Sequence, residues 1–270
     1  MGETEDLEEL YRSYNRRDLV HPDPVELLYP FPDVREREMA GILASSLAYG
    51  NVRQIVRNAR DALERMSPAP RVFLERSGPA EVRKAFRGFK HRFTTGGELS
   101  RFLEGLRRVI GMHGSLESCF MSHFHREDDT ILPALRLFVE EIRRGCGGPV
   151  RSLAPSPADG SACKRLNLFM RWMVRRDEVD PGGWNGVSPS KLVIPLDTHM
   201  HRTGLAMGLT RRRSADLRTA LEITAAFRAI SPEDPVRYDF ALTRLGILKK
   251  SPRSQEASTP SPTLPRAPSP

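Results

Sequence analysis

The chain has 270 residues, of which 39% are hydrophobic and 28% are charged, so it can bury a sizeable core. This composition excludes a wholly disordered protein, a collagen-like fibre and a disulfide-stapled miniprotein. Lys and Arg number 42 against 34 Asp and Glu, and the net charge of +8 is compatible with nucleic acid or another polyanion as a partner.

Charge is distributed unevenly along the chain. Residues 1–35 contain nine acidic and four basic residues, whereas residues 160–250 contain sixteen basic and nine acidic residues. We therefore expect a bound polyanion to contact mainly the second half of the chain.

Apolar residues spaced three to five apart predict helices through most of the chain. Residues 36–66 read as two amphipathic helices that break at Gly50 and Asn51, two residue types that tolerate a positive φ. No long alternation of β-branched residues predicts a large sheet. The fold class is therefore predicted as all-α, with further helices over residues 99–110, 131–144, 161–176, 216–227 and 238–248.

The composition changes after residue 250. Residues 251–270 contain six prolines and five serines and almost nothing apolar. Such a segment buries too little to offset the entropy lost on ordering. We predict one helical domain over residues 1–250 and a disordered tail over residues 251–270.

The three cysteines, Cys119, Cys146 and Cys163, are scattered and odd in number. This pattern indicates reduced thiols rather than a disulfide framework or a metal-ligand set. The first six residues are acidic, unlike a secretory signal, and no apolar run approaches the roughly 18 residues that span a bilayer. We expect a cytoplasmic protein with no membrane partner.

Residues 195–208 form the segment richest in chemically active side chains. Asp197 or Thr198 is placed to cap the following helix by accepting its free N–H groups. The positive end of the helix would keep such a carboxylate ionised and fixed. The alternative interpretation is a simple helix cap with surface histidines beside it.

His199 and His201 raise the possibility of a metal site. A His-x-His pair near an aspartate occurs in metal-dependent hydrolases. However, residues two apart on a helix do not face the same way, so further ligands would have to come from elsewhere. We assign no metal, and keep a metal-dependent hydrolase as an alternative.

Lys164 is the second candidate for chemistry. It is predicted in the first turn of the helix over residues 161–176, where the helix end and Arg165 disfavour an ammonium. A free amine can attack an electrophilic carbon. The alternative is a solvated surface lysine. Lys164 becomes the stronger candidate for a catalytic residue only if Asp197 faces it.

Several residues are candidates for contact with nucleic acid. Trp184, in a Gly-rich loop, is predicted to be exposed enough to stack on a base, whereas Trp172 is predicted in the core. Tyr49 and Asn51 at the helix break are ligand contacts or merely turn residues. The run of arginines at 211–213 is a phosphate-contact site or a solvated charge run.

Residues 195–199, Pro-Leu-Asp-Thr-His, followed by Arg202, resemble the segment that carries the catalytic aspartate of the helix-hairpin-helix DNA glycosylase superfamily. Residues 38–66 resemble the N-terminal helix pair of that fold, and residues 223–246 resemble its closing helices. More closely, the chain resembles an uncharacterised bacterial family known only as a domain of unknown function, through residues 47–50, 161–167, 180–182 and 196–199.

The chain departs from the superfamily pattern in three ways. It lacks the Leu-Pro-Gly-x-Gly hairpin and the iron–sulfur cysteines, and Lys164 lies 33 residues before Asp197. The archaeal 8-oxoguanine glycosylases, whose lysine lies well upstream on a helix, are more similar in this respect.

The resemblance implies a two-lobed helical fold that excises a damaged or modified base from double-stranded DNA without a cofactor. Asp197 would stabilise the oxocarbenium-like sugar, and Lys164 would form a Schiff base able to cut the strand. Both should lie in one positively lined groove. The residues implied in nucleic-acid contact are Trp184, Tyr49, Asn51, His199, Arg202, Arg211 and Arg212.

Two further alternatives remain beside the metal-dependent hydrolase. One is a non-catalytic nucleic-acid-binding relative, which would bind duplex in a salt-dependent way without releasing a base. The other is a scaffold for protein interactions.

Overall fold

The computed structural model describes residues 3–150 and 152–248. The predicted disordered tail, residues 251–270, lies outside this part. The described residues form twelve α-helices: α1 (Glu3–Tyr14), α2 (Val34–Ser46), α3 (Val52–Glu64), α4 (Pro70–Arg76), α5 (Pro79–Ala85), α6 (Gly96–His113), α7 (Leu116–Met121), α8 (Leu132–Gly145), α9 (Lys164–Val174), α10 (Thr198–Ala206), α11 (Leu217–Ile230) and α12 (Asp239–Leu248). Short 3₁₀ turns lie at Arg17–Leu19, Pro24–Leu28, Pro157–Asp159 and Pro189–Lys191.

The mostly helical class predicted from the sequence is confirmed. The only sheet in the described residues is a hairpin, in which β1 (Lys90–His91) pairs antiparallel with β2 (Thr94–Thr95). Sequence periodicity did not delimit α4 and α5. These two helices have seven residues each, too short to show a repeat, and each begins with a proline.

The break predicted between the first two long helices is confirmed. Gly50 has a φ of +102°, a conformation that side chains other than glycine rarely adopt. Asn51 then caps α3, because its side chain accepts hydrogen bonds from the backbone N–H groups of Arg53 and Gln54. This cap fixes the direction in which α3 leaves the turn.

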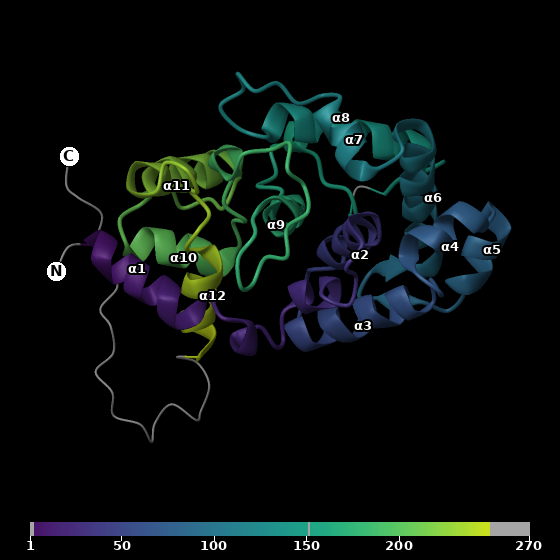
Figure 1. Cartoon of the computed structure of the whole chain (residues 1–270), viewed down its shortest axis with the longest axis horizontal. Helices are drawn as coiled ribbons and strands as arrows, with labels where there is room; N and C mark the ends of the chain where they lie inside the picture. The colour runs from purple at the N-terminus through teal and green to yellow at the C-terminus, as the bar shows by residue number, and fades with distance from the viewer. Residues whose placement is uncertain (1–2, 151, 249–270) are drawn as a thin grey trace.

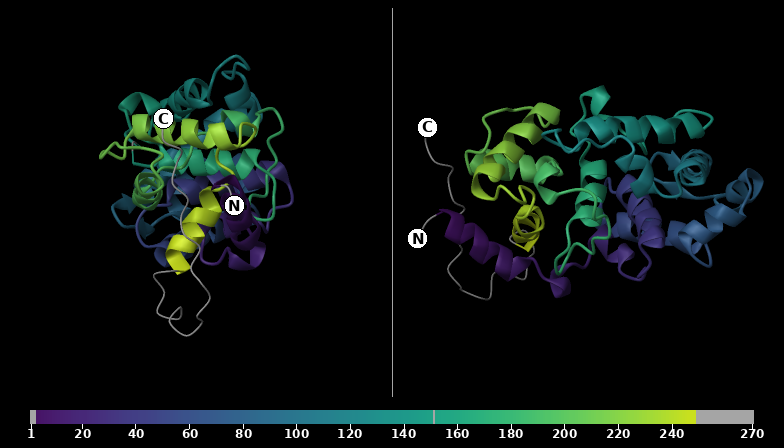
Figure 2. Two further views of the ribbon diagram at one scale, coloured as in Figure 1. Left: turned by 90° about the vertical axis from the view of Figure 1, so that its left-hand side faces the viewer. Right: turned by 45° about the horizontal axis from the view of Figure 1, so that its top comes forward.

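The helices pack in two groups (Figure 1). Helices α4, α5, α7 and α8 pack against α6, and α2 packs against α3, α4 and α7, whereas α10 and α12 pack together with α1 at the other end of the molecule. Helices α1 and α12 lie side by side although they come from opposite ends of the chain (Figure 2). The carboxylate of Glu8 on α1 accepts hydrogen bonds from Arg237 and Tyr238, the two residues that precede α12.

Helix α9 passes through the centre of the molecule and packs against α2 (Figure 1). The apolar residues whose spacing predicts this helix, Leu166, Phe169, Met170, Met173 and Val174, are buried, and Trp172 is a core residue as predicted. Burial extends around the helix to Arg171, whose guanidinium is therefore paired with the carboxylates of Asp180 and Asp239. The sequence predicted one buried face; the central position of α9 buries most of its circumference.

None of the helices in residues 3–150 and 152–248 combines the length and apolar character needed to cross a bilayer.

Candidate active site

Lys164 and Asp197 meet at the junction of α9 and α10. Nζ of Lys164 lies 3.1 Å from Oδ2 of Asp197, although 33 residues separate them in the chain. Lys164 is the first residue of α9 and Asp197 caps the start of α10. The tertiary structure therefore forms an ion pair from two helix N-termini, and both side chains stay partly open to solvent.

Asp197 is held rigidly by its own helix. Its Oδ1 accepts hydrogen bonds from the backbone N–H groups of His199 and Met200, both at 2.8 Å. Burial raises the pKa of this carboxyl, but the neighbouring Lys164 and the N–H of Met200 outweigh burial and lower its pKa below the usual range. Asp197 is therefore an ionised carboxylate with its second oxygen directed at an amine.

The turn before Lys164 differs from the sequence prediction. Helix α9 begins at Lys164 rather than at residue 161, because Cys163 adopts a left-handed conformation with a φ of +48°. No side chain caps this helix end. Lys164 thus projects from the first turn, next to backbone N–H groups that carry partial positive charge.

A cavity of about 210 Å³ contains the pair. Besides Lys164 and Asp197, its polar lining includes Asp23, Arg171 and Asp239. Its apolar lining is Pro22, Pro24, Ala48, Gly50, Val52, Ile55, Leu168, Trp172, Pro195 and Phe240. The cavity is smaller than the roughly 300–1,000 Å³ typical of drug-sized ligand pockets, which suits one ring system.

The expectation of a positively lined groove is wrong for this cavity. Three carboxylates and two basic side chains line it, and Arg171 is already paired with Asp180 and Asp239. Burial raises the pKa of Asp239 to about 6, against the opposing effect of Arg171. Burial likewise raises the pKa of Asp23. The floor of the cavity therefore offers hydrogen-bond acceptors rather than free positive charge.

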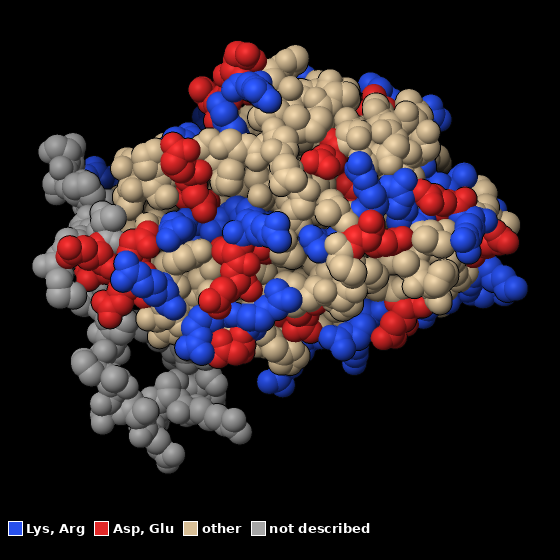
Figure 3. Space-filling model, viewed as in Figure 1, with Lys and Arg blue, Asp and Glu red and all other residues tan. Residues whose placement is uncertain are grey.

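Ion pairs also reduce the free positive charge in the second half of the chain, where a bound polyanion is expected. Arg175 is paired with Asp177, Asp180 and Asp234. Arg237 is paired with Glu8. The positive charges of Arg171 and Arg175, both counted in residues 160–250, are thus neutralised inside the molecule. On the face shown in Figure 3, basic and acidic side chains are interspersed.

The prediction that Trp184 is exposed is wrong. Its side chain is 1% exposed and its Nε1–H donates a hydrogen bond to Oε2 of Glu38 at 3.1 Å. Its ring packs edge-on against Phe169 and close to Phe120. The backbone N–H of Trp184 bonds to Met173 O, which draws the loop onto α9, so the indole is part of the core.

Tyr49 and Asn51 have structural partners at the helix break. The hydroxyl of Tyr49 lies 3.0 Å from the carbonyl oxygen of His91 and 2.7 Å from Oγ1 of Thr94. The ring of Phe93 stacks on that of Tyr49, with centroids 4.8 Å apart and planes 19° apart. Asn51 is exposed but its side chain is engaged in capping α3. Phe93 therefore covers a face of the ring that the sequence analysis offered to a base.

The histidines of α10 point to different partners. The ring of His199 packs on α12, where Gly246 leaves room for it, and its Nε2 lies 3.4 Å from Leu242 O. Nε2 of His201 lies 2.8 Å from Arg212 O. These partners account for both rings without a shared ligand. Within residues 3–150 and 152–248, no three His, Cys, Asp or Glu side chains gather as metal ligands would.

The predicted phosphate contacts are unequally available. Arg202 and Arg211 are exposed. Arg212 donates to Oγ1 of Thr219 and to Oδ2 of Asp216, which holds it along the start of α11. The three cysteines are buried, and burial raises the pKa of each thiol, to about 12 for Cys119 and about 11 for Cys146 and Cys163. They are protonated at neutral pH.

Two residues near the pair were missed by the sequence analysis. Asp239 lies in the cavity, yet only its position at the start of the last helix marked it. Phe93 is 63% exposed beside Tyr49. The sequence feature that could have drawn attention to Phe93 is the segment around it, residues 82–97, which contains five Lys or Arg and no acidic residue.

The comparisons with known proteins agree with part of the resemblance. No curated protein and no solved structure matches the chain. One family model, described as "Protein of unknown function (DUF2400)", matches residues 23–248, which include Asp23, Lys164, Asp197 and Asp239. The chain therefore belongs to the DUF2400 family.

Proposed function

We propose that the protein cleaves the N-glycosidic bond of a damaged or modified base in DNA and is able to form a Schiff base at the sugar. The observation that carries the proposal is the 3.1 Å contact between Lys164 and Asp197 inside a cavity of about 210 Å³. Such a reaction uses two groups that lie close together: an amine that attacks the sugar and an ionised carboxylate beside it.

The pair supplies a balanced route. Lys164 passes a proton to Asp197, and the lone pair of the free amine forms a bond to C1′ of the sugar. The bond from C1′ to the base breaks, its electron pair leaves on the base nitrogen, and the base takes a proton from Asp197. The nitrogen bonded to C1′ then gives a proton to Asp197, and its lone pair forms the C=N bond as the C1′–O4′ electron pair leaves on O4′. O4′ takes the proton from Asp197, so the sugar ring is open and the amine has become a protonated imine.

Asp197 has a second role as it passes its proton to the departing base. The carboxylate that this transfer leaves is ionised, and it favours the positive charge that develops on the sugar. The backbone N–H groups of His199 and Met200 keep the carboxylate in place, so little reorganisation is needed during the reaction. Extruding the base into the cavity costs a few kcal/mol, least for a damaged or mismatched base.

The test is borohydride trapping on duplexes that carry an abasic site or one of a panel of damaged bases. We expect the wild type to form a covalent adduct. The control variant Lys191→Gln should also form it, because the amine of Lys191 bonds to the carbonyl oxygen of Asp128, away from the pair. Lys164→Gln should give no adduct. Asp197→Asn, which still caps α10, should slow adduct formation by about 100-fold or more.

Other results would contradict the proposal. If the wild type forms no adduct with any duplex, the Schiff-base step is wrong. If Asp197→Asn reacts at the wild-type rate, Asp197 has no part in the chemistry. Salt-dependent duplex binding without adduct or base release would favour a non-catalytic nucleic-acid-binding protein instead.

A further inference from the structure

A phenylalanine stands exposed at the tip of the β1–β2 hairpin. Phe93 is 63% exposed, the largest exposed fraction among the bulky hydrophobic side chains of residues 5–150 and 152–246. Its neighbour Arg92 has a φ of +52°, which costs about 1 kcal/mol or more for a residue with a side chain. The hairpin thus keeps an apolar ring in water on a strained two-residue loop.

The position of Phe93 is rigidly supported from below. Its ring stacks on Tyr49, and the hydroxyl of Tyr49 is tied to both strands through His91 O and Thr94 Oγ1. His91 is buried and bonds to Tyr49 O and to Asn58 on α3. One face of the Phe93 ring is therefore occupied by Tyr49, and the exposed remainder is held in a defined orientation.

The hairpin tip lies at the rim of the Lys164–Asp197 site. The guanidinium carbon of Arg165, the residue after Lys164, is 5.1 Å from the centre of the Tyr49 ring. A Cβ built on Gly50, which lines the cavity of the pair, would lie 2.7 Å from Nη1 of Arg92. Phe93 is thus connected to the site through Tyr49 on one side and through Arg92 on the other.

Positive charge around the tip is unpaired. In the part of the chain that the structure describes, Lys90, Arg92 and Arg165 form no ion pair, and Arg165 bonds only to a backbone oxygen, that of Ser46. Burial lowers the pKa of Arg165, since no carboxylate compensates it. This differs from Arg171 and Arg175, whose charges are fully engaged inside the molecule.

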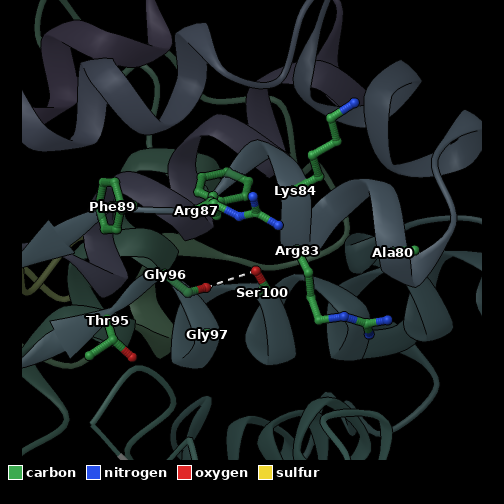
Figure 4. Close-up of a pocket in the computed structure, with 11 residues that line it drawn as sticks. Ala80, Arg83, Lys84, Arg87, Phe89, Thr95, Gly96, Gly97 and Ser100 are labelled. Carbon is green, nitrogen blue, oxygen red and sulfur yellow. Dashed lines mark hydrogen bonds between the residues drawn. The ribbon is translucent and has the colours of Figure 1, made fainter.

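The same basic segment lines a second, shallow cavity of about 580 Å³ (Figure 4). Arg83, Lys84 and Arg87 surround it, together with Gly96 and Gly97 at the start of α6. All three basic side chains are exposed and free of ion pairs within the described residues. Phe89 and Thr95 line this cavity and also flank the hairpin, so the two features adjoin.

We propose that the hairpin and the segment before it form a nucleic-acid-binding surface, in which Phe93 stacks on an unpaired base and the basic side chains of residues 83–92 contact the strand's phosphates. Aromatic rings beside cations bind unpaired bases in this way, because every base offers a flat face and every linkage a negative charge. The inference rests on the proposed function in that it places the strand next to Lys164 and Asp197.

The first test uses the fluorescence of a new indole. The two natural tryptophans are at most 1% exposed, so the Phe93→Trp variant adds the sole accessible indole in the described residues. A mixed-sequence single-stranded oligonucleotide and a duplex with a tetrahydrofuran abasic analogue should quench it. The matched control is Met112→Trp, because Met112 is 59% exposed and lies about 24 Å along α6 from the hairpin end.

The second test measures affinity by fluorescence anisotropy. Phe93→Ala should weaken binding of both oligonucleotides at least fivefold, and Phe93→Tyr should restore it. The triple variant Arg83→Gln, Lys84→Gln, Arg87→Gln should make binding less steeply dependent on salt, by up to about 2 in the logarithmic slope for three phosphates on a single strand. Arg136→Gln with Arg144→Gln, whose charges are paired on α8, should leave the slope unchanged.

The outcomes separate this inference from the proposed function. Trapping through Lys164 together with an unquenched Phe93→Trp variant would overturn the hairpin surface and keep the chemistry. Quenching at residue 93 without any Lys164-dependent adduct would support the surface and overturn the Schiff-base reaction. Binding that is equally strong in Phe93→Ala, or no binding of either oligonucleotide at low salt, would overturn the surface.

Discussion

The carboxylate of Asp239 accepts a hydrogen bond from the guanidinium of Arg171 within the cavity that Lys164 and Asp197 share. Arg171 is also bonded to Asp180, so the cavity floor is continuous with a buried charge network at the centre of the molecule. Asp239 is the one carboxyl of the cavity whose pKa is raised to about 6. Its protonation is therefore coupled to both folding and the site.

Asp239→Asn should change how stability depends on pH. Since burial raises the folded-state pKa to about 6, this residue stabilises the fold at low pH and loses that contribution as pH rises through 6. The free energy of unfolding of the wild type relative to Asp239→Asn should fall by about 3 kcal/mol between pH 3 and pH 7. Urea unfolding at several pH values measures this, and a constant difference would contradict it.

Asp197→Ala and Asp197→Asn should separate capping from chemistry. Alanine removes the acceptor for the N–H groups of His199 and Met200, whereas asparagine retains it. We expect Asp197→Ala to be less stable than Asp197→Asn by about 1 kcal/mol. Both should form the Schiff base more slowly than the wild type, by about 100-fold or more. Thermal unfolding compares their stabilities, and equal values would mean that the cap contributes nothing.

Trp184→Phe should lower stability rather than nucleic-acid affinity. The change removes the indole donor to the buried carboxylate of Glu38, which keeps only the backbone N–H groups of Leu116 and Glu117. A loss of about 1–3 kcal/mol in unfolding free energy is expected. Met112→Ala, at an exposed site, should change it by less than about 0.5 kcal/mol. If oligonucleotide binding weakens and stability is unchanged, Trp184 contacts nucleic acid and the prediction is wrong.

Gly50→Ala should disturb Arg92. Two effects combine there: a φ of +102° and a new Cβ only 2.7 Å from Cδ and Nη1 of Arg92. Gly88→Ala is the matched control, because its φ is +77° but no atom lies within 4 Å of the added Cβ. Both should lose about 1 kcal/mol from backbone strain, and Gly50→Ala should lose more.

A double-mutant cycle isolates the contact with Arg92. In an Arg92→Ala background, the Gly50→Ala change should cost no more than Gly88→Ala does. Chemical unfolding of the four proteins of the cycle supplies the numbers. An undiminished cost in that background would show that strain alone, and not the approach of Arg92, requires glycine at position 50.

The sequence by itself determined the features that depend on neighbours within one or two helical turns. Apolar periodicity located α2, α3, α6, α8, α9, α11 and α12, and the Gly50–Asn51 pair marked the break between α2 and α3. The role of Asp197 as a helix cap and the burial of Trp172 were also readable, because a cap acts on N–H groups two or three residues away and a buried stripe repeats along one helix.

Only the tertiary structure decided which distant groups meet. The contact of Lys164 with Asp197 depends on the packing of two helix ends 33 residues apart, and nothing in the local pattern encodes it. The same holds for Trp184, whose loop looked exposed until α9 and Glu38 enclosed it. Charge counts do not distinguish buried from exposed charge for a related reason: a buried arginine such as Arg171 must be paired, so it gives the surface no positive charge, whereas the basic residues beside Phe93 are exposed.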